Sequence, residues 1–353
     1  MMSLKMLRHL VALSAMFLIT MSTNKHGVAN AYTFRPPLPG APAAIKCARC
    51  TRSIGPGDVY LEAMNQLWHP QCLTCAACNK PLPEGAFIMD EQSQKPFCNP
   101  CFIHHHAERC GVCAKPLTGQ CLTTFHWGDK YCVEHEQMEK CYCCGRPVCN
   151  TLTGGGVRYR DGRLVCNICM TQASPVDDQE TAMQLLYTVW NDLSGMGFDL
   201  GPIENMPPLR LVDAQATEGV DGTSILSTQK FYGREVGRST EVLVLHSLPR
   251  THMGSVIAHE LGHFLIHQWG FPDLPDQVEE GLCELLACTW LTSQAGDPYA
   301  EYHYRLKLTN QDPIYGEGLR AALTAVGGNH EFSVQLFDFV RQHGHLPKTV
   351  GPR

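Results

Sequence analysis

The sequence lacks two features that would place it in a membrane or on nucleic acid. Its apolar-rich stretch near the amino terminus, residues 10–21, holds twelve residues, whereas a helix that spans a bilayer needs about 20. Residues 47–171 have no basic stripe, since 12 basic and 11 acidic side chains give a net charge of +1. We therefore expect no stable membrane anchor and no nucleic acid partner, because phosphate binding needs clustered cationic side chains.

Charge is unevenly divided along the chain. Residues 172–353 carry 11 basic and 23 acidic side chains, a net charge of −12, which favours basic or neutral partners over acidic ones. The length of 353 residues exceeds one ordinary hydrophobic core and predicts two or three domains.

Cysteine is abundant, and the spacing of the 19 cysteines separates metal sites from disulfides. One Cys-x2-Cys pair is followed after 18 residues by His-x2-Cys, and then by two further Cys-x2-Cys pairs that are 19 residues apart. This register is that of a LIM domain with two tetrahedral zinc sites. The predicted ligands are Cys47, Cys50, His69 and Cys72 for the first ion, and Cys75, Cys78, Cys98 and Cys101 for the second.

An irregular second copy of this pattern begins nine positions after the first ends. Its histidine and cysteine have changed places, and Tyr131 precedes the third ligand as Trp68 precedes His69. His126 is a rival for the histidine ligand. The predicted ligands of this LIM-like domain are Cys110, Cys113, Cys132 and His135 for one ion, and Cys141, Cys144, Cys166 and Cys169 for the other.

The remaining cysteines are interpreted as spare or core thiols rather than ligands. Cys143 is the one that could compete with a neighbour for metal. Cys283 and Cys288 are five positions apart on a predicted helix, so they face different ways and should not form a disulfide. The other two are Cys121 and Cys149.

The amino-terminal segment has the pattern of an export signal. Lys5 and Arg8 precede the apolar stretch, and the small residues Ala29 and Ala31 flank one position, as at a cleavage site. We predict a signal peptide over residues 1–31, with a periplasmic or secreted location after cleavage near Ala31. The Pro- and Ala-rich residues 32–46 then predict an extended linker.

Residues 259–263 are HELGH. On a helix, His259 and His263 lie one turn apart on the same face, so both imidazoles can bind one metal ion. Glu260 then points beside the ion, toward the water that the metal activates, as a general base. Apolar residues recur at helical spacing around the motif and favour a buried helix.

Carboxylates that follow the motif supply candidates for the third ligand. Glu279 and Glu280 lie 16 and 17 positions after the second histidine. Glu280 is followed by glycine, a step that resembles the one carrying the metal-binding glutamate in Glu-type zincins, so it is the predicted ligand and Glu279 is the alternative. Glu284 or Asp276 is expected to orient a ligand histidine.

An oxyanion donor is the hardest role to assign from the sequence. Tyr315 is the candidate, with His330 and Tyr304 as further possibilities.

The predicted fold class is α+β, in which zinc-ribbon-like LIM and LIM-like modules precede a mainly helical zincin-type (Glu-zincin) metallopeptidase domain with a small sheet. Strands are expected at 209–213 and 241–246, a loop at 219–222, and a helix capped by Asp177 or Asp178. The predicted boundaries are 47–103 for the LIM domain, 108–171 for the LIM-like domain and 177–353 for the metallopeptidase domain.

The order of these modules resembles that of the LIM-domain peptidases of the plant DA family, which restrict organ growth. The segments that carry the resemblance are VLHSLPRTHMGSVIAHELGH, LPDQVEEGLCELLACTWL and DPIYGEGLRAA. Members of that family are ubiquitin-activated peptidases that cleave growth regulators, so the resemblance implies a peptidase. The predicted signal peptide stands where the plant proteins carry ubiquitin-interacting motifs, which favours an exported, bacterial relative.

The sequence as a whole predicts a zinc-dependent endopeptidase that acts on proteins or peptides. One catalytic and four structural zinc ions are expected, about five in all. The LIM region would recruit or gate protein substrates. The alternatives are an inactive adaptor that keeps the zincin fold, and an aminopeptidase or isopeptidase that uses the same site.

Overall fold

The computed structural model divides into two compact units, one over residues 17–137 and one that includes residues 138–353. The division falls inside the predicted LIM-like domain, so the two ligand sets of that domain belong to different units. The predicted signal peptide and linker lie outside the described residues, except for Lys46 and the backbone of three short strands. The structure describes residues 46–350 without 56, 64, 83–86, 218 and 232–233, and describes only the backbone of 18–21, 27–30, 33–35 and the rest of 228–238.

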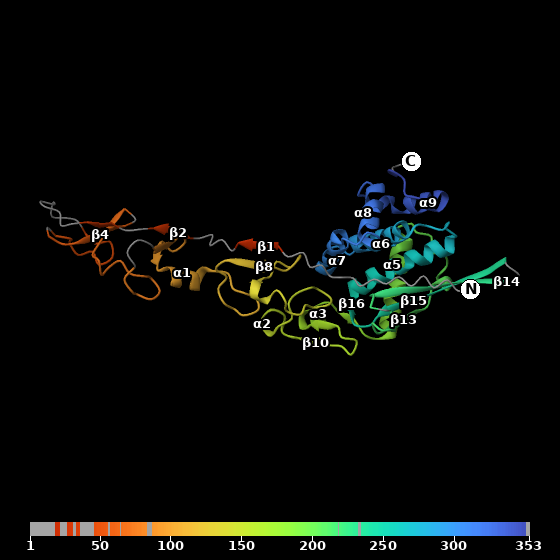
Figure 1. Cartoon of the computed structure of the whole chain (residues 1–353), viewed down its shortest axis with the longest axis horizontal. Coiled ribbons are helices and arrows are strands. Elements are labelled where there is room, and N and C mark those ends of the chain that lie inside the picture. Colours follow the sequence, from red (N-terminus) through yellow and green to blue (C-terminus); the bar gives the residue numbers. More distant parts are fainter. Residues whose placement is uncertain are drawn as a thin grey trace. The chain divides into compact units, whose positions relative to one another are not determined.

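The first unit contains three antiparallel sheets of three strands each (Figure 1). In each sheet a hairpin leads to a pair of predicted zinc ligands, and a strand from the amino-terminal segment pairs with the hairpin. The sheets are β3 (Thr33–Arg35) with β4 (Tyr60–Ala63) and β5 (Gln66–Trp68), β2 (Gly27–Asn30) with β6 (Phe87–Asp90) and β7 (Lys95–Phe97), and β1 (Leu18–Met21) with β8 (Gln120–Thr123) and β9 (Lys130–Cys132).

One backbone turn recurs at each of the four Cys-x2-Cys pairs that open a ligand set. The residue after the second cysteine has a positive φ, which lets the chain turn back, and an isolated antiparallel bridge then closes the turn. The same local geometry in all four copies supports one kind of metal-binding module repeated along the chain. The residues with positive φ are Thr51 (60°), Asn79 (57°), Ala114 (61°) and Gly145 (70°).

A short helix follows the third ligand in three of the four ligand sets. Cys98, Cys132 and Cys166 are the residues immediately before these helices, in extended conformation. The fourth ligand lies three residues later, on the first turn, and therefore faces back toward the third. The helices are α1 (Asn99–His106), the 3-10 helix η1 (Val133–His135) and α3 (Asn167–Gln172).

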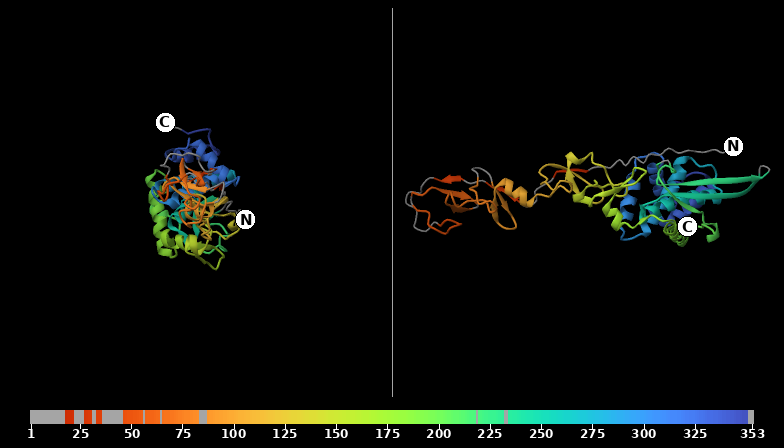
Figure 2. Two further views of the ribbon diagram at one scale, coloured as in Figure 1. Left: turned by 90° about the vertical axis from the view of Figure 1, so that its left-hand side faces the viewer. Right: turned by 90° about the horizontal axis from the view of Figure 1, so that it is seen from below.

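The second unit is built around a mixed sheet in the order β13-β15-β14 (Figures 1 and 2). β13 (Leu209–Val212) runs parallel to β15 (Arg234–Leu245), and β14 (Gly222–Phe231) runs antiparallel to it. The two expected strands are therefore present. The expected loop at 219–222 ends where β14 begins, a strand that the sequence analysis did not anticipate.

Helices α4 and α5 contact this sheet and further helices pack beyond them, which confirms a mixed α/β class. Asp178 caps α4 by accepting a hydrogen bond from the Thr181 amide at 2.8 Å, as one of the two expected caps. No helix in the described part of the chain has the length and apolarity needed to cross a membrane. The helices are α4 (Gln179–Gly195), α5 (Arg250–Trp269), α6 (Asp276–Ser293), α7 (Pro298–Thr309), α8 (Tyr315–Ala325) and α9 (Ser333–His343).

Shorter elements complete the second unit. They lie in the segment before α4, between α4 and the sheet, and around the start of α5 and α9. These elements are α2 (Asn150–Thr153), β10 (Gly156–Arg158), β11 (Leu164–Cys166), β12 (Pro175–Val176), η2 (Ile203–Asn205), β16 (Leu248–Pro249) and η3 (His330–Phe332).

Helix α5 is the centre of the second unit, because it contacts the sheet, α4 and α6. Its apolar residues are buried on nearly every face, so tertiary packing rather than amphipathicity stabilises it. At Gly262 it approaches α6 closely: a Cβ atom there would lie 2.9 Å from the Cα of Cys283 and 2.8 Å from its Sγ. Glycine at this position therefore sets the distance between α5 and α6.

We expect Gly262→Ala to destabilise the second unit by about 1–3 kcal/mol, because the added methyl group must push α6 backbone away from α5. Thermal unfolding followed by circular dichroism measures this change. Gly195→Ala on α4 is the matched control, since nothing lies within 4 Å of a Cβ at that position and alanine favours the helix. Equal midpoints for the two variants would contradict the proposed close contact.

Candidate metal centre

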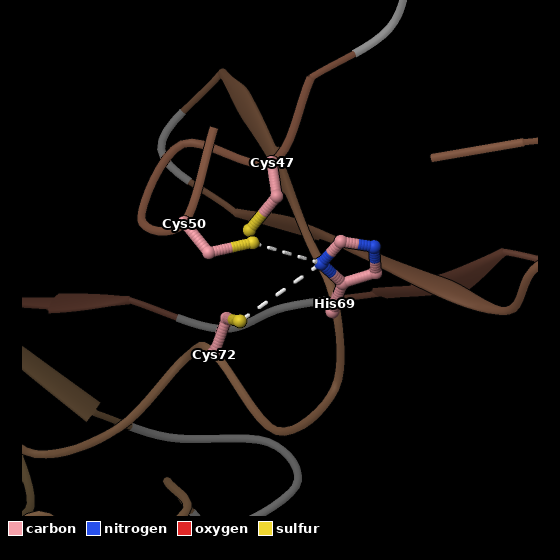
Figure 3. A group of neighbouring side chains, drawn as sticks. All are labelled: Cys47, Cys50, His69 and Cys72. Carbon is pink, nitrogen blue, oxygen red and sulfur yellow. Dashed lines mark hydrogen bonds between the residues drawn. The ribbon is translucent and has the colours of Figure 1, made fainter. Parts of the chain in front are cut away.

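The four predicted cysteine and histidine ligand sets are each brought together. In every set one ligand atom per residue lies within 4.8 Å of the others. In the first set the Sγ atoms of Cys50 and Cys72 lie 3.4 and 3.9 Å from Nδ1 of His69, and Figure 3 shows these side chains pointing toward one another with Cys47. Such clusters of cysteine and histidine are typical of structural zinc sites.

Backbone amides lower the thiol pKa of the first cysteine in each of the first two ligand sets. Burial alone would raise the pKa of Cys47, but hydrogen bonds from amides, including that of Cys50, lower this pKa to about 6. The same balance lowers the pKa of Cys75 to about 6. The thiolate, which is the form that binds zinc, is therefore favoured before an ion arrives.

The third set contains His135 and not its rival His126. His135 ends the turn that follows Cys132, where the other sets also carry their fourth ligand. The ring of His126 instead contacts that of Trp127, with centroids 4.7 Å apart. The residues brought together here are Cys110, Cys113, Cys132 and His135.

The fourth set differs from the others because all four of its cysteines are buried. The Sγ atoms of Cys141 and Cys169 are 3.8 Å apart, as are those of Cys144 and Cys166. None of the 19 cysteines forms a disulfide. Cys121, Cys143 and Cys288 are buried, while the Sγ of Cys149 accepts a hydrogen bond from the amide of Leu152 at the start of α2.

The fifth candidate site lies between α5 and α6. His259 and His263 lie one turn apart on α5, with ring centroids 5.2 Å from each other. Oε2 of Glu280 on α6 is 3.2 Å from Nε2 of His259 and 3.6 Å from Nε2 of His263. Two imidazole nitrogens and one carboxylate oxygen thus converge at a single point.

Two further carboxylates lie beside the opposite nitrogens of the same rings, and that of Glu279 is hydrogen-bonded to Nδ1 of His263. Oε1 of Glu284 lies 3.3 Å from Nδ1 of His259, and Oε1 of Glu279 lies 3.0 Å from Nδ1 of His263. A carboxylate at Nδ1 fixes the tautomer that leaves Nε2 free to bind a metal. The geometry therefore favours Glu280 over Glu279 as the ligand and places Glu284 next to Nδ1 of His259, the position from which it was expected to orient this ring. Asp276, the other candidate for that role, is the first residue of α6.

The buried carboxylate and imidazoles of this site are suited to binding a cation. Oε2 of Glu280 is buried and makes no hydrogen bond, although both imidazoles are near. Burial would raise the pKa of Glu280 and lower that of His259; their mutual interaction instead lowers the Glu280 pKa and, with Glu284, raises the His259 pKa to about 9. An ion between these groups would satisfy the orphaned oxygen and remove the need for a protonated imidazole.

The residues of this site whose ligand atoms lie within 4.8 Å of one another are His259, His263 and Cys283. Burial raises the pKa of the Cys283 thiol to about 12. Oε2 of Glu280 lies 3.2 and 3.6 Å from the two Nε2 atoms and makes no hydrogen bond, so we favour Glu280 as the third ligand. The Cys283 thiol packs against Gly262.

Glu260 accepts a hydrogen bond from a residue of the sheet that the sequence analysis missed. Oγ of Ser224 on β14 donates to Oε2 of Glu260 at 2.7 Å. Two residues earlier, a Cβ on Gly222 would lie 2.4 Å from Cγ1 of Val256 and 3.4 Å from Oε1 of Glu260, so glycine is required where β14 crosses α5. Ser224 is 36 positions from Glu260, and no spacing rule connects the two.

Tyr315 lies beside the histidines, at the first position of α8. Its ring centroid is 6.2 Å from that of His259, and burial, followed by the charge of Glu280, raises its pKa well above the usual value. The hydroxyl is therefore protonated and able to donate. The two alternative candidates instead contact each other, with the Tyr304 hydroxyl 3.1 Å from Nε2 of His330.

Comparisons with known proteins agree with the two kinds of module in the structure. A LIM domain matches residues 47–106, and a DA1-like domain, described as Protein DA1, matches residues 211–306. The chain carries a LIM domain and a DA1-like domain. The DA1-like match contains the two histidines and Glu260 of α5, and Glu279, Glu280 and Glu284 of α6.

Similar proteins come from plants. Protein DA1 of Arabidopsis thaliana is 27% identical over 374 residues, which cover 85% of this chain and 68% of the relative. LIM domain-containing protein HDR3 of Oryza sativa subsp. japonica is 28% identical over 381 residues, or 85% and 74% of the two chains. Protein DA1-related 2 of Arabidopsis thaliana is 29% identical over 323 residues, or 77% and 59%. The expected bacterial origin gains no support from these relatives.

We expect Glu280→Gln to weaken zinc binding between α5 and α6 more than Glu279→Gln, because only Glu280 faces both Nε2 atoms. Loss of an outer carboxylate such as Glu279 typically costs about 10–100-fold in metal affinity, and loss of the ligand should cost at least that much more. Competition with a chromophoric chelator on the full chain measures both affinities. The assignment is wrong if Glu279→Gln is the more damaging change.

Proposed function

We propose that the DA1-like domain is a zinc-dependent endopeptidase of the zincin type. The observation that carries this proposal is the convergence of two Nε2 atoms and the Glu280 carboxylate, with Glu260 beside them. A zinc ion held by His259, His263 and Glu280 would act as a Lewis acid and lower the pKa of a bound water to about 7.

Glu260 is the proposed general base. Ser224 holds its Oε2, so Oε1 is the oxygen that takes the proton and later delivers it to the leaving amine. Gly222 leaves space beside Oε1, because a side chain there would crowd this oxygen. Tyr315, with a protonated hydroxyl next to His259, is the proposed donor to the substrate carbonyl oxygen.

The sheet supports a polypeptide substrate. β14 pairs with β15 along one edge, and no described strand pairs with its other edge. An extended peptide can add to such an edge through main-chain hydrogen bonds. Because Ser224 of β14 contacts Glu260, this edge is close to the catalytic base. We therefore favour internal cleavage of protein chains over an aminopeptidase or isopeptidase reaction.

The inactive-adaptor alternative is less well supported. An adaptor that had lost its chemistry would have no need for a general base held by a hydrogen bond or for two carboxylates on the outer nitrogens of the histidines. The LIM region is proposed to recruit or gate protein substrates, without nucleic acid. Export after cleavage near Ala31 stays a prediction from the sequence.

We expect about five zinc ions per chain, four in the cysteine clusters and one between α5 and α6. Plasma mass spectrometry of protein prepared without chelator gives the total. A value near one would contradict the assignment of the four cysteine clusters to zinc.

Glu260→Gln should lower kcat on an unfolded protein substrate by about 10²–10⁴-fold, because the amide cannot accept the proton. Zinc content, measured on the same preparation, should be unchanged. Glu180→Gln, an exposed change on α4, is the matched control and should keep parental activity. A Glu260→Gln variant that retains its zinc and digests the substrate at the parental rate would refute the proposed base.

A further inference from the structure

The fourth cysteine cluster, defined as Cys141, Cys144, Cys166 and Cys169, belongs to the same compact unit as the DA1-like domain. The Sγ atom of Cys169 lies 3.6 Å from the hydroxyl of Tyr299 on α7. A Cβ on Gly145, in the turn of this cluster, would lie 3.1 Å from the hydroxyl of Tyr302. The fourth cluster is thus packed against the helices of the domain.

A buried ion pair anchors the loop between β10 and β11 of the cluster to the sheet. Arg163 and Asp161 are 2.8 Å apart, with 4% and 2% of their side chains exposed. Nη1 of Arg163 donates to the carbonyl of His246 just after β15, and Asp161 accepts from the amide of Ala214 just after β13. A buried pair needs such additional hydrogen bonds to offset its desolvation, so the docked geometry is specific.

A second contact leads from the cluster to the catalytic strand. The hydroxyl of Tyr142, between the first two cysteines of the cluster, donates to Oδ1 of Asp221. Oδ2 of Asp221 lies 2.9 Å from Nε2 of His252 on α5. Asp221 is the residue before Gly222, where β14 begins. The carboxylate therefore joins the cluster, the start of β14 and α5.

β14 is consequently attached to α5 at two points. Asp221 contacts His252 at one point, and Ser224 contacts Glu260 at the other. The two strand residues are about 10 Å apart at 3.3 Å per residue, and the two helix residues about 12 Å apart at 1.5 Å per residue. Two contacts at matching separations fix both the position and the rotation of the strand, whereas Ser224 alone would fix neither.

We propose that Asp221 is a positioning residue for the catalytic base. Through the hydrogen bond from Tyr142 to Asp221, the fourth cluster would help to position this base. Asp221 acts by holding the first residues of β14, so that Ser224 keeps Oε2 of Glu260 in place. This inference rests on the proposed peptidase function for its kinetic consequence, but its structural consequence, the fixed start of β14, is independent of activity.

The test compares Tyr142→Phe and Tyr159→Phe in the zinc-loaded full chain. Both changes remove one hydroxyl from the fourth-cluster module, but the Tyr159 hydroxyl contacts the sulfur of Met170 and not Asp221. Loss of a hydrogen bond to a carboxylate should raise amide exchange in residues 222–227 on the order of 10-fold in Tyr142→Phe only. On an unfolded protein substrate, kcat should fall by a similar factor while KM changes less than about twofold, because the substrate contacts are intact.

A second pair of variants separates positioning from folding. Asp221→Ala removes both contacts and should lower kcat further than Tyr142→Phe. Asp221→Asn keeps an acceptor for Tyr142 and offers a donor to Nε2 of His252, so it should restore kcat to within about threefold of the parent. Zinc content should stay parental in Tyr142→Phe.

The possible results test three separate claims: that Asp221 positions β14, that the chain is a peptidase, and that the position of β14 affects the catalytic base. If Tyr142→Phe matches Tyr159→Phe in both exchange and kcat, Asp221 does not position β14 and the inference is wrong. If the parent chain hydrolyses no substrate, the proposed function fails, while amide exchange still decides whether the Tyr142 contact holds the strand. Faster exchange in Tyr142→Phe with unchanged kcat would overturn the link from Asp221 to the catalytic base.

Discussion

The close approach of α5 and α6 at Gly262 and Cys283 is the constraint on which the candidate catalytic site depends. The histidines are on one helix and the three carboxylates on the other. The imidazole nitrogens and carboxylate oxygens lie 3.0–3.6 Å apart, and a larger separation of the two helices would break these contacts. A second glycine contact keeps α6 and α8 together, since a Cβ on Gly281 would lie 2.6 Å from the carbonyl oxygen of Gly318, and α8 carries Tyr315. Small residues thus determine where the reactive groups meet.

Buried charge is the second constraint, and it explains why so many ionisable groups share one region. Two imidazoles facing Glu280 would be costly to bury without an ion or a proton. Glu284 is itself balanced by Lys307 of α7, whose Nζ lies 2.8 Å from its Oε2. Lys307 is a supporting residue that the sequence analysis missed. Against the effect of burial, its cation lowers the pKa of Glu284, which stays ionised beside Nδ1 of His259.

The site residues that could be predicted from the sequence are those whose pattern depends on the spacing of residues along the chain. The Cys-x2-Cys pairs recur at regular intervals and the HELGH motif places two histidines one turn apart, so the four cysteine sets and the histidine pair were named in advance. Cys283, which the structure groups with these histidines, was instead interpreted as a core thiol. Only the glycine after Glu280 separated this residue from Glu279 in the sequence, because residue spacing does not show which face of α6 meets which imidazole nitrogen. Ser224 and Asp221 were not identifiable, because β14 reaches Glu260 and Tyr142 only through tertiary packing.

The fourth cluster shows why a repeated motif need not define a structural unit. Its turn is the same as in the other three clusters, down to a positive φ after the second cysteine. Yet its ligands are all buried, whereas the other clusters leave three of four ligands at least partly exposed. The difference comes from the residues between the ligands: Tyr142 and Arg163 make buried contacts with the sheet. Zinc ligands specify the fold of each module, and the side chains between them decide what that module is attached to.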